Sequence, residues 1–229
     1  MAEEGGGGFL RAWAWKREHR SDKERFTKPY MHKIQISGED TQTVLRIQQA
    51  AFKEEGFAST IWDSSIVMSK FFEKHASEFA QKRCLDLSAG CGLVGIVLAK
   101  LGAHVTSTDL GPNLSLLERN CELNAPGEID VKEHTWGHQI EQLGGPFDLI
   151  VACDIMYIPE AVGAIVKTLE GASGSGSCVY VAHGRNNRAE EDFLKLCSRV
   201  FWVEDVTSGE LDEVYQTSDV TVLRLRKRA

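Results

Sequence analysis

The chain has 229 residues, 42% of them hydrophobic, and a formal net charge of −7 at pH 7. This length predicts one domain with a substantial core plus an N-terminal extension. The acidic balance argues against nonspecific binding of nucleic acid, and because no run of about 18 apolar residues occurs, we expect no membrane span.

The N-terminal stretch differs in composition from the rest of the chain. Its first 33 residues carry eight Lys or Arg and five Asp or Glu, and Gly5 to Gly8 form a linker-like run. We therefore predict a partly flexible extension at 1–30 and a domain at 31–229. The extension is either a loosely packed tail or a docking segment for an acidic surface of a partner.

The start of the chain also bears on location. It lacks the charged and apolar regions of a signal peptide, and its acids argue against a mitochondrial presequence. The expected location is the cytoplasm, with the nucleus as an alternative. The six cysteines show no CxxC motif and no paired spacing with His, so we interpret them as small hydrophobic residues in a reducing compartment.

A small hairpin and a helix are predicted for residues 31–80. Apolar residues alternate in 33–36 and 44–47, which predicts two antiparallel strands with a turn at 38–40. Gly56 begins a loop that runs to Trp62. From Asp63 to Phe79 the apolar residues recur at helical spacing and predict a helix that covers the sheet.

Residues 83–101 have the pattern of a strand, a glycine turn and a helix, which is the first half of a βαβ unit. The turn consists of five small residues, Ser88, Ala89, Gly90, Cys91 and Gly92. Glycines let the backbone approach a ligand closely, and the helix that follows offers free N–H groups.

The next predicted strand begins at His104 and ends at Asp109, about twenty residues beyond the glycines. An acid there can accept hydrogen bonds from both hydroxyls of a ribose. The glycine pattern alone also fits a dinucleotide site or a purely structural turn. Asp86 narrows the choice, because an acid before Gly90 would repel a pyrophosphate but could receive the ammonium group of a methionine moiety. This favours S-adenosyl-L-methionine over NAD.

After Asp109 the predicted helices and strands continue to alternate. We expect helices at 112–123, 159–169 and 188–199, and strands at 129–134, 147–153, 177–182, 201–206 and 220–225. A polar loop joins the last two strands, which indicates an antiparallel pair. The seven strands therefore predict an α/β fold with a mostly parallel sheet.

Asp154-Ile-Met-Tyr157 follows the buried strand at 147–153. In an open α/β sheet the ligand crevice lies at the carboxyl ends of the strands, so Asp154 and Tyr157 are expected at the same edge as the glycine turn. Two other interpretations stay open. Asp154 could cap the helix that begins near Pro159, and Tyr157 could be a packed aromatic residue with its hydroxyl at the surface.

Five segments in this order resemble the seven-strand, S-adenosylmethionine-dependent protein-lysine methyltransferases with a DxxY motif, the methyltransferase-like twenty-one group. They are residues 61–69, 86–96, 101–106, 135–137 and 154–157. The resemblance covers roughly residues 56–226 and implies a Rossmann-like class I methyltransferase core at 81–229. It also implies methyl transfer to a lysine amine of a protein, with S-adenosyl-L-homocysteine as the product.

The resemblance implies roles for single residues in cofactor binding. Trp62 would cover the methionine end, and the turn from Ser88 through Ala89 and Gly90 to Gly92 would form the backbone cradle. Asp109 would hold the ribose hydroxyls.

Further along the chain, Trp136 would pack on the adenine beside Cys153, and Asp154 and Tyr157 would face the substrate amine. The family usually has Gly at position 88 and commonly has Ala at position 153. A Cβ at Ser88 could therefore crowd the methionine moiety.

Alternatives to this function also stay open. The chain could be a small-molecule N-methyltransferase of the nicotinamide type, or a non-catalytic protein that keeps the fold as a binding module. Trp62 and Trp136 could be ordinary core aromatic residues. Substrates in the resembling family include chaperones, AAA-type ATPases and translation elongation factors. We expect a protein substrate of this kind, no nucleic-acid, membrane or metal partner, and a monomer.

Overall fold

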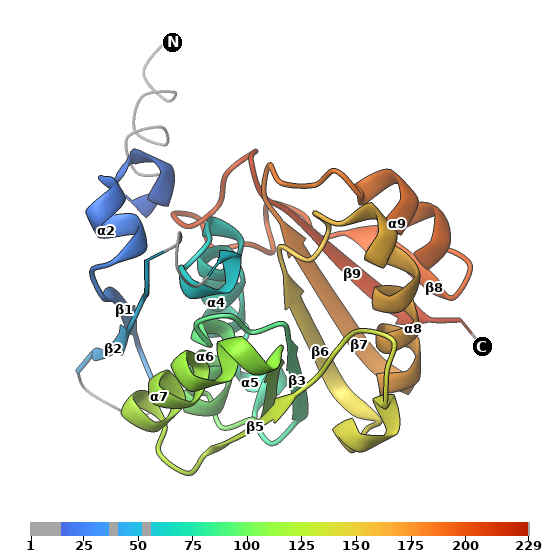
Figure 1. The fold of residues 1–229 in the computed structure, drawn as a ribbon, viewed down its shortest axis with the longest axis horizontal. Coiled ribbons are helices and arrows are strands. Elements are labelled where there is room, and N and C mark those ends of the chain that lie inside the picture. The colour runs from blue at the N-terminus through green and yellow to red at the C-terminus, as the bar shows by residue number, and fades with distance from the viewer. Residues whose placement is uncertain (1–14, 37–40, 52–55, 229) are drawn as a thin grey trace.

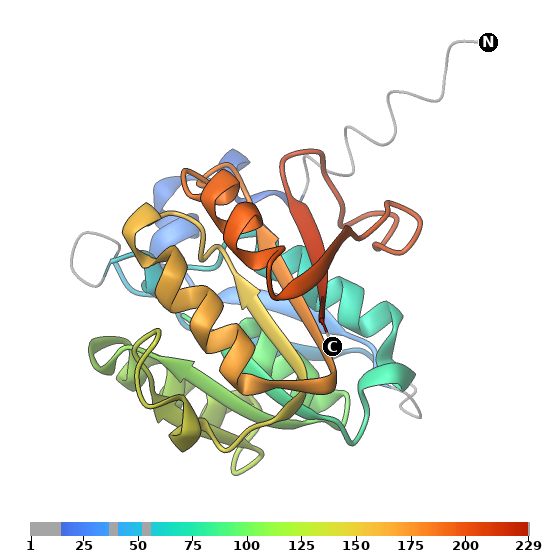
Figure 2. The same ribbon diagram turned by 90° about the vertical axis from the view of Figure 1, so that its right-hand side faces the viewer.

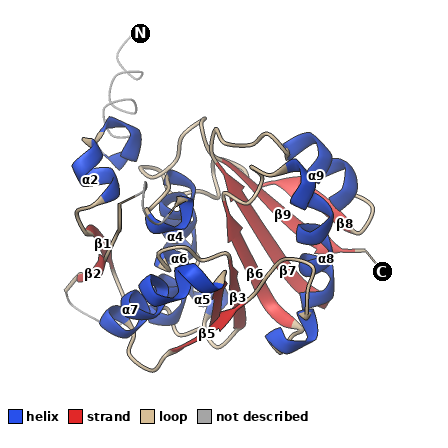
Figure 3. Cartoon of the chain, viewed as in Figure 1, coloured by secondary structure: helices blue, strands red, loops and turns tan. Residues whose placement is uncertain are grey.

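The computed structural model of the protein describes residues 15–36, 41–51 and 56–228. A seven-stranded sheet forms the centre, and helices cover both of its faces (Figure 1). Figure 3 shows the same arrangement by element type, with a two-stranded sheet lying to one side. The predicted α/β fold class is confirmed.

The seven strands lie in the order β5-β4-β3-β6-β7-β9-β8. Their bounds are Arg83–Leu87 (β3), His104–Asp109 (β4), Ile129–Glu133 (β5), Phe147–Cys153 (β6), Ser173–His183 (β7), Phe201–Asp205 (β8) and Thr221–Lys227 (β9). Every neighbouring pair is parallel except the two that involve β9, which is antiparallel to β7 and to β8. The predicted antiparallel pair is confirmed, but no sequence pattern indicated that β9 inserts between β7 and β8.

The order of the strands reverses between β3 and β6. From β3 the next two strands extend the sheet toward β5, and β6 then returns to the other side of β3. At such a switch point the carboxyl ends of the strands leave a crevice for a ligand. The glycine turn follows β3 and Asp154 follows β6, so both lie at this crevice.

The sheet separates two hydrophobic cores. Helix bounds are Asp63–Lys74 (α4), Ala76–Phe79 (α5), Leu93–Lys100 (α6), Leu114–Asn124 (α7), Val162–Ala172 (α8) and Glu190–Cys197 (α9). Helices α4 to α7 pack into one core, while α8 and α9 cover the other face of the sheet, which is turned toward the viewer in Figure 2. Side chains alternate along β3, so Cys84 lies in the first core and Leu85 in the second.

Some helix boundaries differ from the prediction. The helix expected from Asp63 to Phe79 is divided into α4 and α5, because His75 (φ −110°, ψ 26°) leaves the helical conformation. Pro112 is the second residue and Pro159 the first residue of short 3₁₀ turns that precede α7 and α8. The 3₁₀ helices span Arg17–His19 (η1), Phe57–Ser59 (η2), Gly111–Asn113 (η3), Ile140–Leu143 (η4) and Pro159–Ala161 (η5).

The predicted hairpin is present as β1 (Tyr30–Ile34) and β2 (Thr43–Ile47), which pair antiparallel. Its predicted turn at 38–40 lies outside the described residues. Side-chain amides of α7 bind the backbone of β2 and of the residue just after it. Asn124 Oδ1 accepts from the Arg46 N–H at 2.7 Å, and Asn120 Oδ1 accepts from the Gln48 N–H at 2.8 Å.

The predicted extension is described only in part. Residues 1–14, with the glycine run, lie outside the described residues, whereas 15–30 contain the short helix α2 (Asp22–Phe26). This part is attached to the domain, for example by Trp15 Nε1, which donates to the Val214 carbonyl at 2.8 Å. The described part of the extension is therefore not a loose tail. Within the described ranges, none of the helices has the length and apolar character needed to cross a membrane.

Candidate active site

A cavity of about 510 Å³ lies at the switch point of the sheet. This volume is in the usual range for a small-molecule site. Nine of the eleven residues singled out in the sequence line it: Trp62, Ser88, Ala89, Gly90, Asp109, Trp136, Cys153, Asp154 and Tyr157. They come from the ends of β4 and β6, from the loops that follow β3, β5 and β6, and from the loop that precedes α4.

The turn after β3 forms the floor of the cavity. Gly90 has a φ of 55°, and a Cβ built there would stand 3.0 Å from the Ala58 carbonyl oxygen. Its N–H donates to Asp109 Oδ2 at 2.7 Å. Glycine at this position therefore permits both the left-handed backbone and the close approach of the loop that carries Ala58.

The Asp109 carboxylate is already engaged by the protein. Besides the Gly90 N–H, its Oδ1 accepts from the Leu110 N–H at 2.8 Å and from Asn113 Nδ2 at 2.6 Å. An ionised carboxylate has about four acceptor positions. Three are used, which leaves about one for a ligand hydroxyl rather than the two predicted, and Asp109 also holds the glycine turn in place.

Ser88 contacts the opposite wall of the cavity. It has a φ of 62°, and its Oγ accepts a hydrogen bond from Trp136 Nε1 at 2.8 Å. The expectation for Ser88 considered only the bulk of its Cβ. The structure adds a contact through the hydroxyl, which fixes the indole of Trp136 in the wall of the cavity.

Two of the predicted residues, Asp86 and Gly92, do not reach the cavity. The Asp86 carboxylate is 3% exposed, and its Oδ2 accepts from the Gly95 N–H at 2.8 Å, beneath the start of α6. Burial raises the pKa of Asp86 to about 7, and nearby Asp109 adds to this, while the Gly95 N–H opposes it. The predicted direct contact of Asp86 with an ammonium group is therefore not supported.

Gly92 is required for packing rather than for a ligand. It is in the left-handed conformation before α6 (φ 82°), and a Cβ there would stand 2.6 Å from Leu117 Cδ1. The predicted cradle thus ends at Gly90 and Cys91, which line the cavity, and does not include Gly92.

Aromatic rings form the outer wall. Trp62 is half-buried, and its Nε1 donates to the Phe57 carbonyl at 2.9 Å. The Phe57 ring lies 6.2 Å from that of Trp62 and 5.6 Å from that of Tyr157, measured between centroids. Trp62 and Tyr157 therefore face the cavity instead of being plain core residues. Phe57 was not predicted, since an isolated aromatic residue in a loop carries no sequence signal.

The side chain of Asp154 is held from two elements. Its Oδ1 accepts from the Gly184 N–H at 2.8 Å, and its Oδ2 accepts from the Ser64 hydroxyl of α4. Burial raises the pKa of Asp154, and the bonds from Ser64 and Gly184 oppose that rise. Asp154 does not cap the helical turn at 159–161, whose N-cap residue is Ile158, so that interpretation is wrong.

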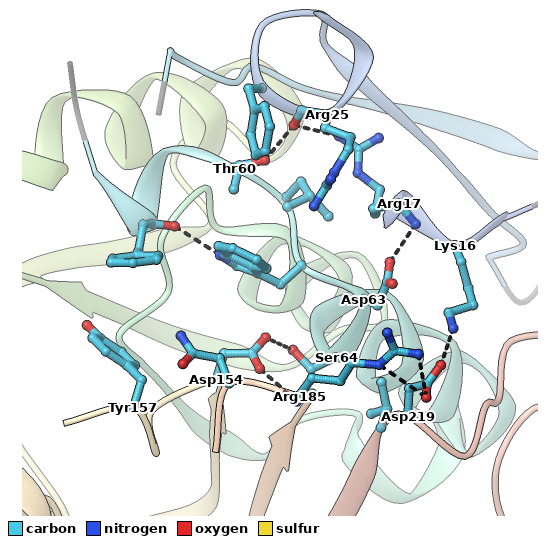
Figure 4. Close-up of a pocket in the computed structure, with 17 residues that line it drawn as sticks. Lys16, Arg17, Arg25, Thr60, Asp63, Ser64, Asp154, Tyr157, Arg185 and Asp219 are labelled. Atoms are coloured by element: carbon cyan, nitrogen blue, oxygen red, sulfur yellow. Dashed lines mark hydrogen bonds and ion pairs between the residues drawn. The ribbon is translucent and has the colours of Figure 1, made fainter. Parts of the chain in front are cut away.

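A second pocket of about 230 Å³ adjoins the first cavity at Asp154 (Figure 4). The two cavities share six lining residues, which are Phe57, Thr60, Ile61, Trp62, Asp154 and Tyr157. The other walls of the second pocket come from N-terminal residues, from α4 and from the loops around Arg185 and Asp219. No sequence pattern predicted this pocket, because the residues of its walls lie far apart along the chain. The arrangement can hold one ligand on each side of the Asp154 carboxylate.

Comparison with known proteins agrees with this geometry. The lysine methyltransferase family matches residues 39–200. Protein N-lysine methyltransferase METTL21A of Mus musculus is 36% identical over 68% of this chain and 73% of its own length. EEF1A lysine methyltransferase 3 of Xenopus tropicalis is 30% identical over 78% of this chain and 81% of its own length.

The fold is also found among solved structures. A TehB-like SAM-dependent methyltransferase from Corynebacterium glutamicum superposes with a TM-score of 0.57 at 21% identity. The match covers 77% of this chain and 92% of that one. At this identity the likeness concerns the fold alone.

Proposed function

This chain belongs to the lysine methyltransferase family and catalyses S-adenosyl-L-methionine-dependent methylation of lysine in proteins, and we propose that the transfer occurs where its two cavities meet. The observation that carries this proposal is the position of Asp154. Its carboxylate borders both the nucleoside-type cavity and the second pocket. A methyl donor on one side and an amine on the other would meet at this residue.

The larger cavity fits the cofactor. It has a glycine-turn floor that a Cβ at Gly90 would narrow, a buried carboxylate at Asp109, and indole groups at Trp62 and Trp136. In the proposed arrangement Asp109 accepts a ribose hydroxyl, Trp136 packs on the adenine beside Cys153, and Trp62 covers the methionine end. When bound, S-adenosyl-L-methionine supplies a methyl group that its sulfonium has already activated.

The protein must then present a neutral amine. A lysine amine has a pKa of about 10.4, so neutralising it near pH 7.4 costs about 4 kcal/mol. Desolvation in the second pocket offsets part of this cost. Ionised Asp154 accepts an N–H hydrogen bond and directs the nitrogen lone pair toward the methyl group. Tyr157, next to Phe57, walls the channel.

In the methyl transfer, one bond forms as another breaks. The amine nitrogen forms a bond to the methyl carbon as the carbon–sulfur bond breaks, and S-adenosyl-L-homocysteine leaves. The amine proton passes to water, and Asp154 serves to orient the amine rather than to act as an obligatory base.

The substrate class and the cellular location of the enzyme are also part of the proposal. One relative is named EEF1A lysine methyltransferase 3. We propose that the substrate of this enzyme is a chaperone, an AAA-type ATPase or an elongation factor. We also propose that the enzyme is a monomer and that it is located in the cytoplasm, or alternatively in the nucleus. Cell fractionation and sedimentation would test the location and the monomer.

The decisive experiment is methyl transfer from radiolabelled S-adenosyl-L-methionine into lysate proteins by the purified chain, with Asp154→Asn as the control. We expect label in one or a few protein bands, and mass spectrometry should locate it on lysine. Label found only in solvent-extractable small molecules would support the nicotinamide-type alternative. Cofactor binding without any labelling would support a non-catalytic binding module.

A further inference from the structure

N-terminal residues that lie outside the family match form one wall of the pocket in front of Asp154. The match begins at residue 39, whereas Lys16, Arg17, Arg25 and Phe26 all line this pocket (Figure 4). Its opening is therefore shaped by a part of the chain for which the family supplies no role.

Arg17 fastens this wall to the domain. One guanidinium nitrogen donates to the carbonyls of Glu24 and Arg25, at 2.9 and 2.8 Å, and to Gln49 Oε1 at 2.9 Å. The backbone N–H of Arg17 donates to Asp63 Oδ1 at 2.8 Å, at the start of α4. These bonds fix α2 relative to the helix that also carries Ser64, the partner of Asp154.

Asp219 and Asp63, which line this pocket, already have partners within the chain. Asp219 receives Lys16 and, at 3.0 Å, Arg185. Asp63 accepts the Arg17 N–H. Four cationic side chains thus line a pocket that has three carboxylates among the described residues, those of Asp63, Asp154 and Asp219.

Arg25 differs from the other three cations, because Lys16 and Arg185 pair with Asp219 and the Arg17 guanidinium is used by backbone carbonyls and Gln49. It is half-buried, and its guanidinium lies over the Phe26 ring, 4.9 Å from the centroid. Among the described residues no carboxylate lies within ion-pair distance of it. A planar guanidinium held at a pocket rim in this way is suited to bidentate pairing with a carboxylate.

An incoming lysine meets an excess of positive charge at this rim. A like charge nearby disfavours the ammonium form, which helps the amine to become neutral, but it also opposes entry of the lysine. An acidic side chain next to the lysine in the substrate would offset this repulsion by pairing with a cationic side chain at the rim.

From the position of Arg25 at the rim of the pocket in front of Asp154, we infer that Arg25 is a specificity-determining residue. It pairs with an Asp or Glu close in sequence to the target lysine. The inference rests on the proposed function, because it takes the second pocket as the lysine entrance. The occupant is thus a peptide segment in which acids flank the lysine.

The test uses the full-length protein with S-adenosyl-L-homocysteine bound, and two synthetic peptides that carry one lysine flanked by glutamates or by glutamines. Binding is measured by calorimetry for the wild type, Arg25→Met and Arg25→Glu. Arg25→Met keeps an unbranched apolar stem and removes only the charge. Lys23→Glu is the matched control, because this exposed lysine lies on the same helix and does not line the pocket.

We expect the wild type to bind the glutamate peptide about fivefold more tightly than the glutamine peptide, as for a partly exposed ion pair. Arg25→Met should lose this preference, Arg25→Glu should reverse it, and Lys23→Glu should retain it. The preference should also shrink as salt is raised from about 0.05 to 0.5 M. Equal or absent binding of the two peptides by the wild type, or a preference retained in Arg25→Met, overturns the inference.

Single-turnover methylation of the same peptides separates this inference from the proposed function. Selective binding that depends on Arg25, without methyl transfer to either peptide or to lysate proteins, contradicts the proposed function and leaves the acidic preference standing. Methyl transfer to both peptides at rates independent of Arg25 supports the function and contradicts the inference.

Discussion

At the scale of single residues, the backbone of Asp154 is the most constrained part of the site. It has a φ of 54°, a left-handed conformation that residues other than glycine seldom adopt. Its N–H donates to the Ala182 carbonyl at 2.7 Å, and its two carboxylate oxygens are held by Gly184 and Ser64. Contacts from α4, β7 and the loop after β7 therefore set the direction of the carboxylate.

Replacing Asp154 by Asn should keep cofactor affinity within a few fold and lower the single-turnover rate by about 100-fold or more, because the amide keeps the shape but loses the charge that orients the amine. Tyr157→Phe should cost less, since the ring still walls the channel. The cofactor dissociation constant and the methylation rate are measured on each purified variant. Methylation by Asp154→Asn at the wild-type rate would refute the role of Asp154.

Ser64→Ala should change the pH dependence of the enzyme. The Ser64 hydroxyl lowers the pKa of Asp154 against the effect of burial, so its removal raises that pKa. Because the ionised carboxylate is the active form, the acidic limb of kcat/KM should move to higher pH. Ser69→Ala is the control, since the buried Ser69 on the same helix donates to the Ser65 carbonyl instead. An acidic limb that stays in place, or moves to lower pH, contradicts this role of Ser64.

Ser88 balances a strained backbone against a hydrogen bond. Ser88→Gly relieves the positive φ but loses the bond to Trp136, and since each effect is about 1 kcal/mol, the free energy of unfolding should change by less than about 1 kcal/mol. Ser88→Ala keeps the strain and loses the bond, so it should be about 1 kcal/mol less stable than the wild type. Urea unfolding measures both. Ser88→Ala as stable as the wild type would show that the hydroxyl contributes nothing.

At the scale of elements, α6 lies so close to the sheet that its middle requires glycine. A Cβ built on Gly95 would collide with Ser107 Oγ and would stand 2.8 Å from Asp86 Oδ2, and both of these residues are buried. The Gly95 N–H also donates to the Asp86 carboxylate. The glycine pattern of the sequence thus serves two ends, a floor for the cavity at Gly90 and close packing of helix on strand at Gly95.

Gly95→Ala should therefore lower the free energy of unfolding by about 1–3 kcal/mol, as overpacking of a core does. Gly163→Ala is the matched control on α8, where a Cβ would meet nothing within 4 Å. It should be neutral or stabilising by up to about 1 kcal/mol, because alanine has the higher helix propensity. Thermal or urea unfolding compares the two, and similar changes in both variants would contradict the packing account.

At the scale of the whole molecule, the pocket in front of Asp154 joins the two ends of the chain. Its lining runs from Lys16 to Val220. Gln49 is central to this closure: its Oε1 accepts from Arg17 and from the Ile61 N–H, and its Nε2 donates to the Lys28 carbonyl at 2.5 Å. One buried amide thus links the N-terminal segment to the loop that carries Trp62.

Gln49→Leu should detach the N-terminal segment. It leaves the buried Ile61 N–H without an acceptor, at a cost of about 1–3 kcal/mol, and it removes one of the three acceptors of the Arg17 guanidinium. Trypsin should then cleave within residues 16–28 faster than in the wild type, and the sheet should stay folded. The neighbouring Gln48→Leu is the control, because the Gln48 side chain makes none of these bonds. Equal cleavage rates for Gln49→Leu and the wild type would contradict this account.

Local residue patterns were enough to predict the helices and strands and the edge of the sheet where the site lies. Strand, glycine turn and helix follow from apolar periodicity and from turn residues that act within a few positions of one another. Placing Asp109 and Asp154 at the ends of buried strands brought them to one crevice, because parallel strands end at the same edge. The glycine turn, Asp109 and Asp154 line the cavity for this reason, whereas Trp62 and Trp136 were predicted there only from the family resemblance.

The directions of the side chains and the residues that close the site depend on long-range packing, which local patterns do not record. Asp86 lies on a strand end as Asp109 does, yet its carboxylate turns under α6, a choice made by packing against Gly95. The place of β9 between β7 and β8, the Ser64 contact to Asp154, and the N-terminal wall at Arg25 all depend on contacts between residues far apart in the chain. The spacing of apolar residues along a helix or strand indicates which of its sides is buried, but not which distant element packs against that side.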